Sequence, residues 1–74
     1  MAVVTRRFST RGMHCRSCSM LIEMDVGDLP GVESVTSDHA RGLTEVSYDE
    51  ATIGPEQIVR AITKAGYAAE LLED

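Results

Sequence analysis

The chain has 74 residues and a mass of 8.0 kDa, which allows a single small domain over residues 1–74 and leaves no room for a large enzyme pocket. With 43% hydrophobic and 26% charged residues, it is too apolar for intrinsic disorder. No apolar run approaches the ~20 residues of a membrane span, and no secretory signal is visible. We therefore expect a cytoplasmic protein that does not insert into membranes and that binds or carries a ligand rather than catalysing a reaction.

The formal net charge of −5 argues against nucleic acid as a partner. The charges are unevenly distributed, because residues 1–18 contain four arginines and no acidic residue, while all twelve acidic residues follow. These arginines are Arg6, Arg7, Arg11 and Arg16. Two interpretations stay open. The arginines form a basic end of the molecule that binds an acidic partner, or they are only the solvent-exposed side chains of a strand.

The first half of the chain predicts a strand, a loop and a helix. Residues 3–11 alternate apolar and polar side chains, which is typical of a half-exposed strand, and residues 12–18 form a loop. A helix is expected after Ser17, its predicted N-cap, and ends at Gly27. The stripe that this helix is expected to bury consists of Cys18, Leu21, Ile22, Val26 and Leu29.

A hairpin follows the first helix. Residues 32–38 and 43–48 alternate as strands around a turn signal at residues 40–42. In the second strand, Thr44, Val46 and Tyr48 share one face. The alternation predicts that Glu45 and Ser47 point to the opposite face of the sheet.

The last third of the chain predicts a second helix and a final strand. Gly54 is the expected N-cap, Pro55 fits the first helical position, and Gly66 supplies a left-handed C-cap. Residues 67–72 form the last strand. The order βαββαβ predicts an α+β ferredoxin-like sandwich, with two helices on one face of a four-stranded antiparallel sheet.

The chemistry is concentrated in the segment Met13-His-Cys-Arg-Ser-Cys18. In a cytosolic protein, a C-x-x-C pair such as Cys15 and Cys18 indicates metal or redox chemistry. Two soft ligands suit Cu(I), whereas a closed zinc site normally needs four. The helix N-terminus and nearby arginines should lower the pKa of both thiols. His14 is expected to point away from an ion held by Cys15, its neighbour.

The loop Gly12-Met-His-Cys-Arg-Ser-Cys18, together with residues 22–23, 29–32, 46–49 and 65–67, resembles the heavy-metal-associated domain family. This family comprises bacterial copper chaperones, N-terminal domains of copper-transporting P-type ATPases and mercury-binding relatives. The resemblance implies that Cys15 and Cys18 bind the metal and that Met13 is a buried anchor of the loop. It also implies that Tyr67 faces the site and shields the ion.

The sequence departs from the family pattern at several positions. Thr10, Ser37 and His39 stand at inner-strand positions that are usually apolar in the family, and His14 replaces the common Thr or Ser of the loop. We expect both histidines to be solvent-exposed or hydrogen-bonded rather than metal ligands. No acidic residue lies between Met13 and Cys18, which favours Cu(I) over zinc or cadmium.

The leading hypothesis is a Cu(I) chaperone that delivers its ion by thiolate ligand exchange. The expected acceptor is a copper-transporting P-type ATPase or a similar copper acceptor protein, and the chaperone would act as a monomer or as a metal-bridged dimer. An alternative with the same site is an N-terminal metal-binding domain of such an ATPase. Mercury binding and thiol–disulfide exchange are further alternatives.

Overall fold

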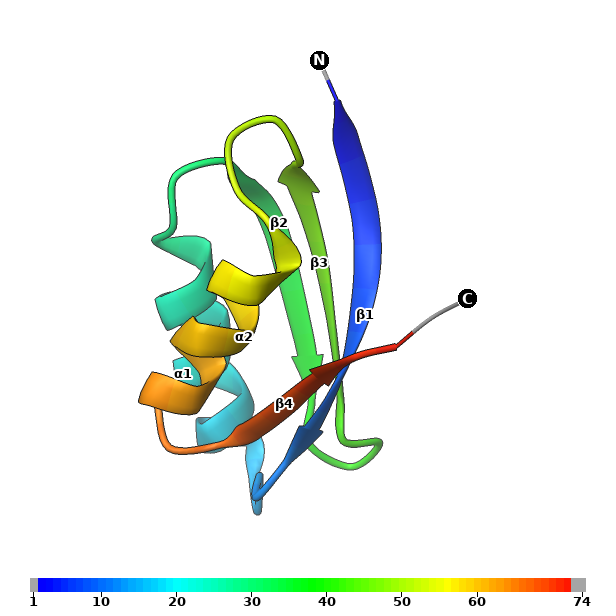
Figure 1. Ribbon diagram of the computed structural model, residues 1–74. Coiled ribbons are helices and arrows are strands. Elements are labelled where there is room, and N and C mark those ends of the chain that lie inside the picture. Colours follow the sequence, from blue (N-terminus) through cyan, green and yellow to red (C-terminus); the bar gives the residue numbers. More distant parts are fainter. Residues whose placement is uncertain (1, 73–74) are drawn as a thin grey trace.

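The computed structural model describes residues 2–72, and the order of its elements is βαββαβ, as predicted (Figure 1). The fold is therefore ferredoxin-like. The elements are β1 (Val3–Arg11), α1 (Arg16–Gly27), β2 (Val32–Asp38), β3 (Leu43–Asp49), α2 (Pro55–Lys64) and β4 (Ala68–Leu71).

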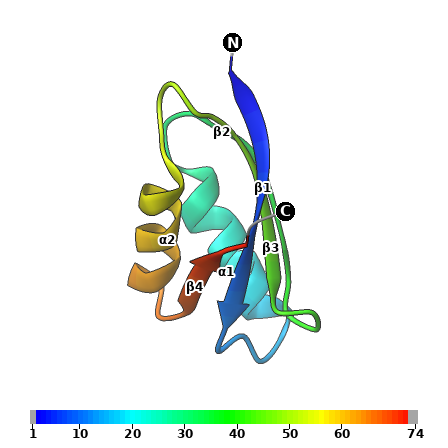
Figure 2. The ribbon, with the colours of Figure 1, turned by 45° about the vertical axis from the view of Figure 1, so that its right-hand side comes forward.

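The four strands form one antiparallel sheet in the order β2-β3-β1-β4. The longest strand, β1, pairs with β3 along most of its length, and its C-terminal half pairs with β4 from Phe8 to Arg11. Both helices cover the same face of the sheet (Figure 2). The β1–α1 loop and the α2–β4 loop consequently lie at the same end of the molecule, at the bottom of Figure 1.

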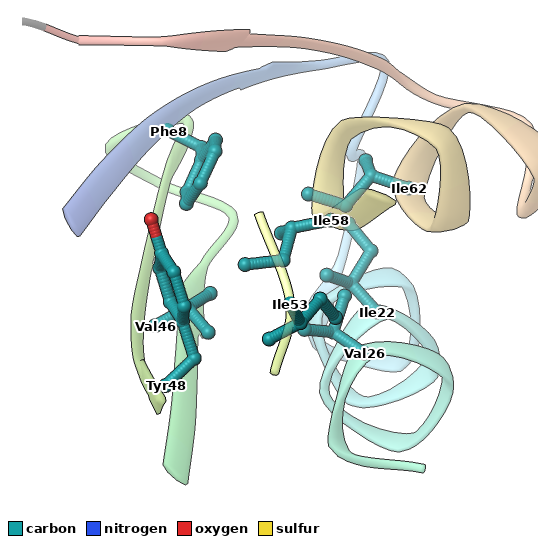
Figure 3. Packing of buried hydrophobic residues seen from close by; sticks show 8 residues of the cluster. All are labelled: Phe8, Ile22, Val26, Val46, Tyr48, Ile53, Ile58 and Ile62. Carbon is teal, nitrogen blue, oxygen red and sulfur yellow. The ribbon is translucent and has the colours of Figure 1, made fainter. Parts of the chain in front are cut away.

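The core lies between the sheet and the two helices (Figure 3). The predicted alternation in β3 is confirmed, because Thr44, Val46 and Tyr48 are all buried. Burial of such apolar side chains is the main favourable contribution to folding. The fully or nearly fully buried hydrophobic residues are Phe8, Ile22, Val26, Val46, Tyr48, Ile53, Ile58 and Ile62.

The second helix begins and ends as expected. Gly54 is the N-cap and Pro55 is the first helical residue. The Gly54 N–H donates to Gln57 Oε1 at 2.8 Å, and the Gln57 N–H donates to the Gly54 carbonyl at 3.2 Å. After the helix, Gly66 has φ +104°, the left-handed region that glycine adopts without strain. The last strand starts one residue later than predicted, at Ala68.

The first helix differs from the prediction in its start and its buried stripe. It begins at Arg16 with Cys15 as N-cap, so the predicted N-cap, Ser17, lies inside the first turn. The buried residues are Ser19, Ile22 and Val26, whereas Leu21 is 41% exposed. The reason is that residues 19, 22 and 26 follow the three- and four-residue spacing that faces the sheet. Leu21 lies beside this stripe.

No helix within residues 2–72 combines the length and the apolar character needed to cross a membrane.

Candidate metal centre

The two cysteines are held by the connection between β1 and α1. After β1 ends at Arg11, Gly12 turns the chain with φ +95°. Cys15 is the exposed N-cap of α1, and Cys18 lies in its first turn, partly buried. The two Sγ atoms are 3.9 Å apart. The loop and the first helical turn therefore bring both sulfurs to one point, as the C-x-x-C spacing predicts.

The surroundings of Cys18 lower the pKa of its thiol. A hydrogen bond from the side chain of Tyr67 is the largest influence, followed by backbone hydrogen bonds from His14 and Cys15, and the pKa of Cys18 falls to about 7. The same hydrogen bond raises the pKa of the Tyr67 hydroxyl. Cys18 is thus close to half ionised at neutral pH. Hydrogen bonds lower the pKa of Cys18, whereas we expected the helix N-terminus and the nearby arginines to do so.

Tyr67 reaches the site from the loop between α2 and β4. Its ring lies against Gly12, since a Cβ atom at that glycine would be 3.5 Å from Tyr67 Cδ1. The contact places the tyrosine hydroxyl beside the Cys18 sulfur, which agrees with the expectation that Tyr67 faces the cysteine pair.

The separation of the two sulfurs is compatible with one soft ion bound between them. Two metal–sulfur bonds of about 2.3 Å span up to about 4.6 Å, somewhat more than the observed separation. Among residues 2–72, no group of three or more His, Cys, Asp or Glu side chains is arranged to hold a metal ion. Within these residues the pair therefore offers two sulfur ligands without further protein ligands of these types, which suits a cation that accepts low coordination numbers.

Met13 points into the protein rather than toward solvent. Its side chain packs against the hydrophobic core, and its Sδ atom accepts hydrogen bonds from Ser37 Oγ at 3.3 Å and Ser19 Oγ at 3.7 Å. This agrees with the role of a buried anchor. The involvement of Ser19 was not expected, although its place directly after Cys18 was a signal that it lies near the loop.

The side chains of both histidines are exposed to solvent. His14 is exposed in the loop, as expected. His39 is also exposed, but it belongs to the turn after β2, so its placement at an inner-strand position was wrong. The turn begins there because the Asp38 carboxylate accepts the N–H groups of Ala40 and Arg41.

The surroundings of the cysteine pair are basic. Arg11 at the end of β1 and Arg16 at the start of α1 are both exposed next to the loop. Arg7, further back on β1, lies 4.0 Å from the Glu45 carboxylate in an exposed ion pair. Arg11 and Arg16 consequently supply the positive potential that a partner would meet at this end of the molecule.

Comparison with known proteins gives a consistent result. Residues 7–68 match the model of the heavy-metal-associated domain. The copper chaperone CopZ of Enterococcus hirae is 36% identical over 90% of this chain and 97% of its own length. The copper-transporting ATPase RAN1 of Arabidopsis thaliana is 35% identical over 97% of this chain, which spans only 7% of that ATPase.

A solved structure agrees with these sequence matches. The solution structure of a putative copper-ion-binding protein from Bacillus anthracis superposes with a TM-score of 0.89 and 33% identity, over 93% of this chain and 97% of that one. Both the fold and the sequence thus point to the same group of proteins. The chain belongs to the heavy-metal-associated domain family.

Proposed function

We propose that this protein binds one Cu(I) ion through Cys15 and Cys18 and delivers it to an acceptor protein. The observation that carries the proposal is the pair of sulfurs 3.9 Å apart, with the pKa of Cys18 lowered to about 7. Soft thiolates without a third ligand of the His, Asp or Glu type suit Cu(I) better than zinc. The relatives of this chain include proteins named as a copper chaperone and as copper-transporting ATPases.

Transfer proceeds by ligand exchange without a change in the oxidation state of copper. A thiolate of the acceptor attacks the two-coordinate ion, a three-coordinate species forms, and one of the original thiolates leaves. A second thiolate of the acceptor then displaces the remaining original thiolate in the same way, so that the ion passes to the acceptor. Cys15 is the exposed member of the pair, so it makes the first bond with an incoming ion. The chain acts as a carrier in the cytoplasm, as a monomer or as a metal-bridged dimer, and its partner is a copper-transporting ATPase or a protein with an equivalent cysteine pair.

The test is a competition titration of the metal-free protein with a Cu(I) chelator, compared with Zn(II) and Hg(II). We expect one Cu(I) per monomer and a strong preference for Cu(I) over Zn(II). Cys15→Ser and Cys18→Ser should each abolish tight binding, whereas Ser17→Ala, an exposed position between them, should not. Wild-type Cu(I) affinity in either cysteine variant would show that the two-thiolate site is wrong.

A second candidate function is the same copper site within a copper-transporting ATPase. It is favoured by the match to RAN1, in which this chain corresponds to a small part of a long protein. An antibody raised against residues 19–74 distinguishes the two in an extract of the native cells. A band near 8.0 kDa supports the free carrier, and a membrane-associated band about fourteen times larger, as the 7% coverage of RAN1 implies, supports the ATPase domain.

A further inference from the structure

A series of hydroxyl groups lies between the sheet and α1, beneath residues 12–18, the metal loop that carries both cysteines. Thr10 Oγ1 on β1 is 2.8 Å from Thr44 Oγ1 on β3, which is 3.0 Å from Ser37 Oγ on β2. Ser37 Oγ is in turn 3.3 Å from Met13 Sδ, and Ser19 Oγ on α1 is 3.7 Å from the same sulfur. Hydroxyls from the sheet and from the helix therefore converge on Met13.

The direction of these hydrogen bonds follows from the number of protons. Each hydroxyl has one proton, and a thioether sulfur can only accept. If Ser37 donates to Met13, then Thr44 donates to Ser37 and Thr10 donates to Thr44. The opposite order would end on the Phe8 carbonyl oxygen, 3.4 Å from Thr10 Oγ1. That distance is long for an O–H···O bond, usually about 2.7–2.8 Å, so the donation runs toward the sulfur.

The hydroxyls are fixed by their surroundings. Thr10, Ser19 and Thr44 are 3%, 4% and 0% exposed. Ser37 lies on an edge strand, and its backbone N–H donates to Glu23 Oε2 of α1 at 2.9 Å, which ties this strand to the helix. Within residues 2–72, every buried side-chain nitrogen or oxygen atom has a hydrogen-bond partner. Loss of one partner would leave a buried hydroxyl unpaired, which is costly, so the arrangement resists change.

The contact between Ser19 and Met13 spans the metal loop. Met13 lies two residues before Cys15, and Ser19 directly follows Cys18. A hydrogen bond between their side chains therefore joins the two ends of the segment that carries both cysteines. The bond from Ser37 connects the same sulfur to the sheet. Together they keep the thioether inside the protein with both of its lone pairs engaged.

We propose that Ser19 and Ser37 are positioning residues of the metal loop. Their hydroxyls hold the Met13 sulfur in the interior, which closes the loop around the cysteine pair and so slows the release of bound copper. The part concerning copper rests on the proposed function. The hydrogen bonds themselves can be tested in the metal-free protein.

The experiment uses protein labelled with ¹³C at the methionine methyl groups, whose spectrum reports the conformation of each methionine. Met13→Leu assigns the Met13 signal. The variants are Ser37→Ala, the double variant Ser19→Ala/Ser37→Ala, and Ser37→Thr, which restores a hydroxyl. Ser34→Ala, at an exposed serine of the same strand, is the matched control. The same proteins are then loaded with Cu(I), and its release to excess chelator is timed.

We expect the Met13 methyl signal to move and broaden in Ser37→Ala, and more so in the double variant, while the signals of Met20 and Met24 stay in place. Cu(I) release from the double variant should be about threefold to tenfold faster than from wild type, as expected for the loss of one hydrogen bond or two. Ser37→Thr and Ser34→Ala should resemble wild type in both measurements.

Two results would overturn the proposal. An unchanged Met13 signal in the double variant would show that the hydroxyls do not hold the sulfur. A changed signal with unchanged copper release would show that they support packing only. If the wild-type protein binds no Cu(I), the proposed function fails, and the methyl spectrum of the metal-free protein still decides whether the hydrogen bonds exist.

Discussion

Removal of the Tyr67 hydroxyl should make Cys18 less acidic. In Tyr67→Phe the ring keeps its contact with Gly12, but the hydrogen bond that most lowers the pKa of Cys18 is lost. The backbone hydrogen bonds from His14 and Cys15 remain, so the pKa should rise from about 7 without reaching the ordinary value of 9.0. A value of about 8 would reduce the thiolate fraction at pH 7 from about one half to about one tenth.

Alkylation with iodoacetamide measures this change, because the thiolate is the reactive form. Trypsin cleaves after Arg16 and so places Cys15 and Cys18 on different peptides, which lets mass spectrometry follow Cys18 alone. The pH at which its alkylation rate is half-maximal should rise by about one unit in the variant. Tyr48→Phe is the matched control, since Tyr48 lies in the core and pairs with Val4 and Val32, away from the cysteines.

Copper binding should follow the same pH dependence. Cu(I) must displace the proton of a thiol but not of a thiolate, so the lowered pKa of Cys18 strengthens binding at pH 7 and below, and this advantage disappears as the pH rises above the pKa of the variant thiol. Tyr67→Phe should therefore bind Cu(I) more weakly than wild type at pH 7 and almost equally at pH 10. An identical pH midpoint of Cys18 alkylation in variant and wild type would refute the assignment of this pKa shift to Tyr67.

Three further predictions concern docking, coordination and stability. Arg16→Glu should slow copper transfer to an acceptor with an acidic rim, and stopped-flow measurements should show the deficit shrinking as salt is raised; Arg60→Glu on α2 makes the same charge change away from the loop and should have less effect. Met13→Leu should leave two sulfurs around Cu(I) in X-ray absorption, and disappearance of a third sulfur in this variant would contradict the inward position of the thioether. Ile62→Ala should lower the free energy of unfolding by about 2–5 kcal/mol in urea denaturation, because Ile62 is 0% exposed. Val59→Ala, at a half-buried position of the same helix, should lower it less, and equal losses would contradict the burial of Ile62.

The elements that could be predicted are those with strong local patterns. Alternation in β3 correctly separated Thr44, Val46 and Tyr48 from their neighbours, since a strand has an unambiguous period of two. The C-x-x-C spacing likewise brings its two sulfurs together within one loop and one helical turn. In both cases the relevant contacts are set by a few consecutive residues.

The errors arose where a tertiary contact decides the outcome. Leu21 was predicted to be buried because it is apolar, yet it is exposed, whereas Ser19 is buried and its hydroxyl contacts the sulfur of Met13. A prediction from hydrophobic periodicity places only apolar residues in the core. It therefore leaves out a serine that is buried with a hydrogen-bond partner on another segment. Similarly, the end of β2 depends on the side chain of Asp38, which places His39 in the turn.

The site also joins distant parts of the chain. Cys15 and Cys18 come from the beginning of the chain, whereas Tyr67, the largest influence on the pKa of Cys18, lies close to its end. During synthesis on the ribosome the cysteine pair therefore emerges long before the tyrosine. In a nascent chain, Cys18 therefore acquires its full acidity only when α2 and β4 have folded and Tyr67 has reached the cysteine pair.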